Sequence, residues 1–343
     1  MKNTFSATLA PLRDHERDDY LRFMGDHLKD GGHFRDIWNW RLSEPDHSGG
    51  EIPFIARADA TLLGTVGVIP MPVSFQGRRF QACWQLDSVV SPKARGMGLG
   101  KRLVNRAAEG WDLVLAKGTS TPMYGLRKSL GYRDVRNSDY LVRIFQPRGI
   151  ATVSAKKALL EELAALWARA LPSPGATGAE TSIEPISSFD ASFDQLADEQ
   201  AREPVFRPRK DAGYLNWRYF KCPLRQYRIF RAGRERALGA IVIKTGPGNE
   251  EGWIVDMVSS STGVTRLLIQ AALEYFRDHR VARVWSFCTH GPSRRALLRQ
   301  GFVPTGITPR FTCSIRSGGA LAKLLPQSPW DFWHGDGDIE LYM

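Results

Sequence analysis

Residues 85–111 read QLDSVVSPKARGMGLGKRLVNRAAEGW and contain three successive patterns. The first, 85–90, has β-branched residues and is followed by Ser91-Pro92, which predicts a short buried strand. The second, 95–100, is a glycine-rich turn. The third is a run of apolar residues at every fourth position, which predicts an amphipathic helix. The apolar positions of this helix are Leu99, Leu103, Ala107 and Trp111.

A strand, a glycine-rich turn and a helix in this order form an anion site. Glycine lets a phosphate approach the backbone N–H groups of the turn, and the positive end of the helix dipole points to the same place. A P-loop needs G-x-x-x-x-G-K-[ST], but Gly96 and Gly100 are one residue too close, and Arg102 stands where a hydroxyl must hold magnesium. A dinucleotide loop, G-x-G-x-x-G, would need glycine where the chain has Lys101. Both common phosphate loops are therefore excluded.

The turn resembles the pyrophosphate loop of the GNAT acyltransferases, [RQ]-x-x-G-x-[GA]. Arg95, Gly98 and Gly100 occupy its fixed positions, and Val90-Ser91-Pro92 is a typical lead-in. The alternative is a glycine-rich loop without a ligand. The strand, proline, arginine and helix are all in register, which favours the resemblance. It implies that the loop binds acetyl-CoA or another acyl-CoA.

The composition of the chain limits its class of protein and its expected location. The chain has 343 residues, 43% hydrophobic and 24% charged, which is typical of a soluble globular protein with room for two domains. No apolar run approaches the roughly 20 residues of a membrane span, and no signal peptide is evident. We therefore expect a cytoplasmic protein without membrane insertion. The four cysteines lack C-x-x-C spacing and the seven histidines form no H-x-x-x-H pair, so no metal site is expected.

The charge of the chain points to an acidic partner. The net charge is +11 and the sequence pI about 9.7, which suits a phosphorylated cofactor, an anionic substrate or nucleic acid. The basic residues are dispersed and no RNA-binding motif appears, which disfavours nucleic acid.

The segments around the turn complete a recognisable order. We expect helices at 14–28 and 123–130 and strands at 4–11, 52–58, 62–75, 79–90, 112–116 and 140–145, the last closing the sheet. This order, β-α-β-β-β-α-β-α-β, is that of a GNAT domain. The prediction is an α/β (α+β) fold with a mixed, largely antiparallel central sheet flanked by helices.

The pattern of the first half recurs in the second half. Four segments of the first half are Asn39-Trp40-Arg41, Leu63-Gly64, Leu86-Asp87-Ser88-Val89 and Leu130-Gly131-Tyr132. Their counterparts, in the same order, are Asn216-Trp217-Arg218, Leu238-Gly239, Val255-Asp256-Met257-Val258 and Gln300-Gly301-Phe302. Four matches in one order indicate a duplication, so we predict two tandem GNAT-like domains.

The two copies differ at the loop. We place a GNAT domain with the pyrophosphate loop at 1–150, a helical and flexible linker at 151–181 and a degenerate GNAT-like domain at 182–343. The second copy retains the helix but has only Gly263 in place of the loop. Only the first half should therefore bind acyl-CoA. The second ends in an aromatic and acidic tail, 330–338, in which we expect Trp330 and Trp333 to dock on the body. Solvated side chains are the favoured expectation for Asp336 and Asp338, and the alternative is that they face an amine substrate.

The resemblance implies direct acyl transfer to an amine, here of a small molecule such as an aminosugar, an amino acid or a natural-product amine. Pantetheine would lie beside 85–90 like an added strand, and the backbone N–H groups of Val89 and Val90 would polarise the thioester carbonyl. The residues implied to hold the pyrophosphate are Arg95, Gly96, Met97, Gly98, Leu99, Gly100 and Lys101.

Proton transfer is less clearly encoded. Many members of the family place a general-acid tyrosine where this chain has Arg127, and Tyr124, about one helical turn earlier, is the candidate to replace it. Asp87, on the predicted slot strand, is the leading candidate for the general base. Because Asp256 recurs in the copy without the loop, a structural role of Asp87, paired with Arg41, is the favoured alternative.

Two other function classes stay open. One is an aminoacyl-tRNA-dependent peptidyl transferase of the same fold, which needs no pyrophosphate loop. The other is a non-catalytic CoA- or nucleic-acid-binding GNAT scaffold, which the missing tyrosine at position 127 permits.

Overall fold

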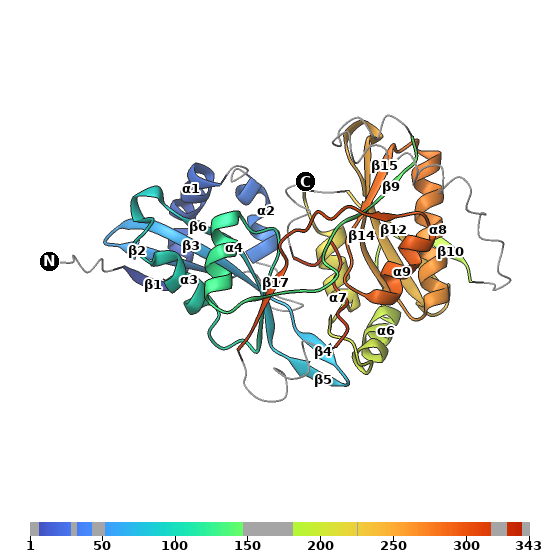
Figure 1. The fold of residues 1–343 in the computed structure, drawn as a ribbon, viewed down its shortest axis with the longest axis horizontal. Coiled ribbons are helices and arrows are strands. Elements are labelled where there is room, and N and C mark those ends of the chain that lie inside the picture. Colours follow the sequence, from blue (N-terminus) through green and yellow to red (C-terminus); the bar gives the residue numbers. More distant parts are fainter. Residues whose placement is uncertain are drawn as a thin grey trace.

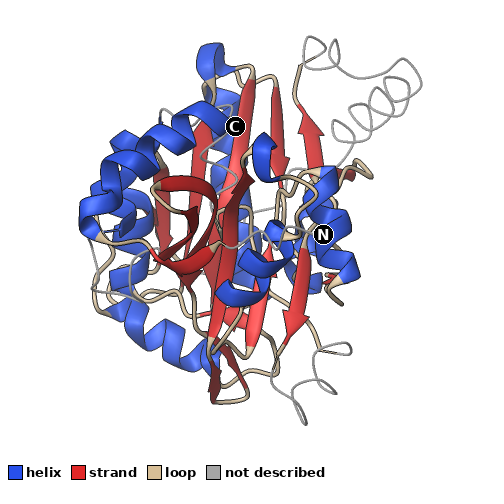
Figure 2. Cartoon of the chain, turned by 90° about the vertical axis from the view of Figure 1, so that its left-hand side faces the viewer, coloured by secondary structure: helices blue, strands red, loops and turns tan. Residues whose placement is uncertain are grey.

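The computed structural model describes residues 7–28, 33–42, 52–146, 181–224, 226–316 and 328–337. The predicted linker lies outside these residues except for Thr181. The described chain forms two seven-stranded sheets and one three-stranded sheet. Strands occupy the middle of the molecule, with helices on either side (Figure 2). The predicted α/β (α+β) class, with mixed and largely antiparallel sheets, is confirmed.

The first sheet has the strand order β1-β2-β3-β6-β7-β17-β8, and only β6 and β7 pair parallel. Its strands are β1 (Thr8–Pro11), β2 (Ile52–Ala58), β3 (Thr61–Pro70), β6 (Ala82–Val90), β7 (Leu113–Ala116), β17 (Thr312–Ile315) and β8 (Arg133–Asp134). The helices of the first half are η1 (Asp14–Glu16), α1 (Arg17–His27), α2 (His33–Leu42), η2 (Pro92–Ala94), α3 (Leu99–Ala107) and α4 (Thr121–Ser129).

The second sheet has the order β10-β12-β13-β14-β15-β9-β16, and only β14 and β15 pair parallel. Its strands are β10 (Ile183–Pro185), β12 (Arg228–Ala232), β13 (Gly239–Thr245), β14 (Glu251–Ser259), β15 (Arg283–Ser286), β9 (Leu141–Ile144) and β16 (Val303–Pro304). The helices of this half are α6 (Ser192–Ala201), α7 (Ala212–Leu215), η4 (Asn216–Phe220), η5 (Pro247–Asn249), α8 (Thr262–Asp278) and α9 (Gly291–Arg299). The third sheet joins β11 (Arg207–Pro208) to β4 (Val73–Phe75) and β5 (Arg78–Phe80).

The two halves exchange one strand each. The prediction that 140–145 closes the first sheet is wrong: β9 lies in the second sheet, antiparallel to β15. In return, β17 takes the corresponding place beside β7 in the first sheet. Figure 1 shows the green β9 beside the orange β15. The placement buries Leu141 completely among apolar residues of the second half, such as Val284.

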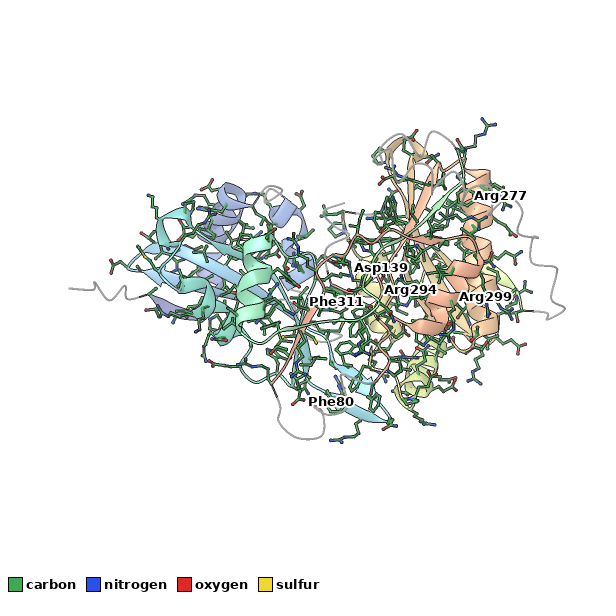
Figure 3. All side chains as sticks on the ribbon, in the orientation of Figure 1. Phe80, Asp139, Arg277, Arg294, Arg299 and Phe311 are labelled. Atoms are coloured by element: carbon green, nitrogen blue, oxygen red, sulfur yellow. The ribbon has the colours of Figure 1, made fainter. Side chains whose placement is uncertain are left out.

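Side chains fix both crossings. Before β9, Arg294 Nη2 donates to Asp139 Oδ1 over 2.7 Å, and Figure 3 shows the two side chains close together. Before β17, Phe311 stacks on Trp84 of β6, with ring centroids 5.3 Å apart. A buried hydrophobic cluster consequently contains residues of both halves.

The repeated Asn-Trp-Arg motifs meet each other. Trp40 and Trp217 stack with centroids 4.9 Å apart, and each indole N–H donates to the backbone carbonyl of the other residue over 2.8 Å. Such reciprocal contacts are those of a two-fold axis relating equivalent surfaces. The contact therefore agrees with the predicted duplication.

The described part of the tail, 330–337, packs against both halves, and residues 332–336 are buried. Trp333 is 1% exposed, which confirms its predicted docking, and Trp330 is half-buried. The prediction of solvated acids is wrong for Asp336, whose side chain is fully buried. Its carboxylate accepts from Lys210 Nζ over 3.0 Å, and Lys210 also contacts Asp256 over 2.5 Å, so the acid has a buried cation as its partner. Asp338 lies outside the described residues.

His334 gives the tail a predictable pH dependence. Its ring is fully buried against Trp253, at 4.6 Å between centroids, and its nitrogens have no hydrogen-bond partner among the described residues. Burial, together with the charges of Lys117, Lys244 and Arg218, holds the pKa of His334 well below its usual value. Below about pH 6.5 the unfolded chain therefore binds a proton that the folded chain does not, and the free energy of unfolding falls as pH falls, by up to about 1.4 kcal/mol per pH unit.

We expect His334→Phe to flatten this dependence, because phenylalanine retains the stacking and does not titrate. Urea unfolding of both proteins between pH 7.5 and pH 5 measures the effect. Parallel profiles for the two proteins would contradict the assignment.

Candidate active site

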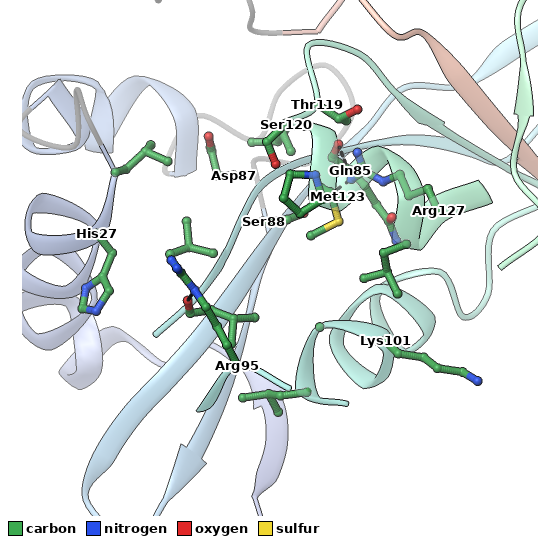
Figure 4. Close-up of a pocket in the computed structure, with 18 of the residues that line it drawn as sticks. His27, Gln85, Asp87, Ser88, Arg95, Lys101, Thr119, Ser120, Met123 and Arg127 are labelled. Carbon is green, nitrogen blue, oxygen red and sulfur yellow. Dashed lines mark hydrogen bonds between the residues drawn. The ribbon is translucent and has the colours of Figure 1, made fainter. Parts of the chain in front are cut away.

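A cavity of about 940 Å³ opens where β6 and β7 separate (Figure 4). These strands pair only over 82–84 and 113–115, and β6 continues to Val90 beyond the pairing. The walls of the cavity come from β6, the glycine-rich turn, the start of α3, the loop after β7, α4 and the end of α1.

Most of the residues predicted to form the site line this cavity. Those that do are Asp87, Val89, Val90, Arg95, Gly96, Gly98, Leu99, Gly100 and Lys101. Met97 and Tyr124 are not among the lining residues, and Met97 is 49% exposed. The sequence did not indicate the contribution of His27, which α1 brings to the opposite wall (Figure 4).

The turn has the conformation that its glycines permit. Gly96 and Gly98 have φ of +79° and +73°, in the region that side chains rarely adopt, and Gly98 directly precedes α3. A Cβ added at either position would meet no atom of the described residues within 4 Å, so the backbone borders open space among them. The N-terminus of α3, Arg95 and Lys101 make this end of the cavity electropositive.

A β-bulge shapes the strand beside the cavity. Thr65 pairs with Val89 and Gly67 with Leu86, so Asp87 and Ser88 both lie opposite one residue of β3. Asp87 has φ of +46°.

The carboxylate of Asp87 holds this bulge to α2. It accepts from Arg41 Nη2 over 2.7 Å, and the side chains of Arg41 and Asp87 are 0% and 5% exposed. The predicted pairing with Arg41 is thus present. The second copy differs, since Asp256 accepts from Lys210 and from the Tyr219 hydroxyl.

Two cations in the wall were missed or unassigned by sequence reasoning. Lys117 Nζ donates to the carbonyl oxygens of Trp333, His334 and Asp336 over 3.2, 2.8 and 2.6 Å, which ties the cavity to the tail. Arg127, which the sequence marked only as a departure from the family, is 1% exposed and lines the cavity. No local pattern could reveal the contacts of Lys117, because its partners are more than 200 residues away.

Tyr124 lies on α4 but is held outside the cavity wall. Its hydroxyl donates to Asp134 Oδ1 over 2.9 Å, and this hydrogen bond is the main cause that raises the pKa of Tyr124. The structure therefore does not bring Tyr124 together with the other predicted site residues.

In the second half, the tail lies in the corresponding place. Beyond the pairing of β14 with β15, Trp333 forms a bridge with Cys288, and the N–H of Gly335 donates to the carbonyl of Val255 over 2.8 Å. Phe332 exchanges hydrogen bonds with Thr289. By the spacing of the repeats, Val255 and Thr289 are the counterparts of Leu86 and Thr119, which line the cavity of the first half.

Other site classes find little support in the described chain. None of its helices is long and apolar enough to cross a membrane. No group of three or more His, Cys, Asp or Glu in it is placed to hold a metal ion. The four cysteines are buried and free.

Comparison with known proteins agrees with this geometry. The sequence model of the acetyltransferase (GNAT) family matches residues 10–111. No curated protein matches the chain in a sequence search.

Solved structures share the fold at low identity. A GCN5-related N-acetyltransferase from Anabaena variabilis superposes with a TM-score of 0.60 and 13% identity, covering 90% of this chain and 73% of that chain. A probable N-acyltransferase from Enterococcus faecalis superposes with a TM-score of 0.57 and 13% identity, covering 90% of this chain and 72% of that chain. N-myristoyltransferase from Saccharomyces cerevisiae, with bound myristoyl-CoA, superposes with a TM-score of 0.56 and 13% identity, covering 91% of this chain and 84% of that chain. The family match assigns residues 10–111, which contain the glycine-rich turn, to the GNAT family, and the solved structures share the fold.

Proposed function

We propose that the chain transfers an acyl group from acyl-CoA directly to the amine of a small molecule, such as an aminosugar, an amino acid or a natural-product amine. The observation that carries the proposal is the continuity of the cavity, which runs from the glycine-rich turn along the bulged end of β6. The open space at Gly96 and Gly98 leaves room for phosphates against the backbone. The volume is at the upper end of the roughly 300–1,000 Å³ of small-molecule sites.

Each wall has a role in this proposal. Arg95, Lys101 and the N–H groups of the turn bind the pyrophosphate. The backbone at Val89 and Val90 orients the acyl carbonyl, and acyl-CoA supplies the activated acyl group. Holding donor and acceptor together provides much of the rate. Asp87, engaged by Arg41, maintains the bulge, and Tyr124 takes no part.

The position of the tail suggests that only one half of the chain binds acyl-CoA. We propose that 1–150 binds acyl-CoA and that 182–343 is the degenerate copy, whose corresponding slot is filled by the tail. Isothermal titration is expected to give one acyl-CoA per chain. A second site of similar affinity would contradict this division.

Ligand-dependent thermal stability tests the proposed function. An acyl-CoA that binds should stabilise the protein by about 2.7 kcal/mol at a hundredfold excess over its Kd. The series should run from acetyl-CoA to myristoyl-CoA, because a structural neighbour binds myristoyl-CoA. Release of free CoA thiol in the presence of a panel of amines then measures turnover.

Each other outcome has a defined meaning. Absence of a shift with every acyl-CoA would overturn the proposal. Binding without turnover on any amine would favour the non-catalytic scaffold. Retention on tRNA at moderate salt would favour the tRNA-dependent transferase.

A further inference from the structure

Arg127 is a buried cation whose charge no anion of the described residues neutralises. Its Nη2 donates two long hydrogen bonds, to the Gln85 carbonyl over 3.3 Å and to Ser88 Oγ over 3.4 Å, while Nε has no hydrogen-bond partner in the part of the chain that the structure describes. Both acceptors are neutral. A buried charge without a counter-charge is strongly destabilising, so the position calls for an explanation.

No anion of the described chain accompanies it. No described carboxylate forms an ion pair with Arg127. Tyr132 is the titratable group that acts on the charge of Arg127, and burial raises the pKa of Tyr132 to about 12, so this phenol is neutral at physiological pH. Burial lowers the pKa of Arg127 only to about 10, so the guanidinium keeps its charge.

The fold itself does not require a cation here. Arg127 lies three residues before Leu130, and Leu297 lies three residues before the corresponding Gln300 in the second copy. Leu297 is fully buried at the equivalent place on α9. The other large buried arginines differ from Arg127, because Arg41 pairs with Asp87 and Arg218 donates to the carbonyls of Gly335 and Gly337.

The cavity can supply the missing anion. Arg127, Gln85 and Ser88 all line it, and Figure 4 shows Arg127 beside Gln85, across the cavity from His27. In the proposed function, the turn and the start of α3 bind the phosphates of acyl-CoA, so these phosphates do not pair with Arg127. No tyrosine or cysteine of the described chain lines the cavity, so the wall near Arg127 offers no phenol or thiol that could protonate a leaving sulfur.

We propose that Arg127 is a catalytic residue that stabilises the negative charge left on the sulfur of CoA. The inference rests on the proposed function. When the acceptor nitrogen forms its bond to the acyl carbon, the carbon–sulfur bond breaks and its electron pair stays on sulfur. The surplus proton of the nitrogen passes to water. Arg127 acts by its fixed charge, as preorganised groups do where charge develops, and it donates no proton.

The pKa of the thiol of bound CoA tests the proposal without turnover. Thiolate absorbance near 240 nm is titrated in the complex, with the desulfo-CoA complex as the blank. A cation within a few ångströms lowers the pKa of an acid by about 1–3 units, and the reference is the pKa of free CoA titrated in the same buffer. We expect this lowering in the wild type and in Arg127→Lys, and its loss in Arg127→Leu, which reproduces the packing of the second copy.

Kinetics give the second readout. Arg127→Leu should lower kcat by about 10²-fold with little change in the KM for acyl-CoA. Arg143→Leu is the matched control, because it removes a half-buried arginine on β9 that donates to the Gln300 carbonyl and does not line the cavity. It should leave both the thiol pKa and kcat unchanged.

Two results would overturn the inference while the proposed function stands. One is a thiol pKa that is equally low in Arg127→Leu and the wild type. The other is a variant that raises only the KM of the acceptor, which would assign Arg127 to a carboxylate of the acceptor. If the wild type forms no CoA complex at all, the proposed function fails first.

Discussion

Gly98→Asp is expected to abolish acyl-CoA binding, with a loss in affinity of at least about 10²-fold. The substitution places a carboxylate at the N-terminus of α3, where the phosphates of acyl-CoA need positive potential. Bringing this carboxylate against the phosphates costs several kcal/mol, and each 1.4 kcal/mol lowers the affinity about tenfold. It also adds a side chain to a residue at φ +73° that borders open cavity. Isothermal titration with the best acyl-CoA measures the loss.

Gly110→Asp provides the matched control. Gly110 has φ of +82°, is exposed and lies outside the cavity, so the variant introduces the same strain and the same charge at a distance from the site. Its thermal stability should fall as that of Gly98→Asp falls, while its affinity stays that of the wild type. Unchanged affinity of Gly98→Asp would remove the turn from the binding site.

Lys210→Met is expected to lower the free energy of unfolding by about 3–5 kcal/mol, a large part of the roughly 5–15 kcal/mol of a typical domain. Lys210 is the buried cation between Asp256 and Asp336, and the three side chains are 5%, 1% and 0% exposed. Although burial opposes it, the two carboxylates raise the pKa of Lys210 above its usual value. Without the lysine, two carboxylates remain buried beside each other.

The loss should depend on pH. Burial already raises the pKa of Asp336 to about 6, and removal of Lys210 raises it further, so protonation relieves the repulsion as pH falls. Urea unfolding should therefore show a larger loss at pH 8 than at pH 5.5. Lys128→Met is the control, because it breaks the exposed pair with Asp134 and should cost about 1 kcal/mol or less. Equal losses in the two variants would show that the buried cluster contributes little.

The local parts of the fold and site could be predicted from the sequence. The strand expected at 85–90 forms the end of β6, and the helix expected from Leu99 is α3. Both elements follow from short-range patterns. The periodicity of apolar residues predicts the strand and the helix, and the glycines predict a turn at positive φ between them. The duplication was visible because short motifs recur in the same order, although Asp87 and Asp256 have different partners.

The remaining features depend on contacts between distant segments. β9 and β17 are only four residues long, so nothing within 140–145 indicates which sheet it joins. The burial of Asp336 depends on Lys210, 126 residues earlier. Tyr124 has the helical spacing expected of a site residue, but Asp134, on the neighbouring β8, accepts its hydroxyl outside the cavity.

The exchange of β9 and β17 sets the order in which a newly made chain can mature. The first sheet gains the strand between β7 and β8 only after residue 315 has left the ribosome, although its other strands end at Asp134. Until then the nascent first half carries an unpaired β7 edge, a surface on which chaperones act and aggregation begins. Neither half, made alone, could supply the strand that its own sheet lacks. A gene split within 151–180 should therefore yield two fragments that become soluble only when they are produced together.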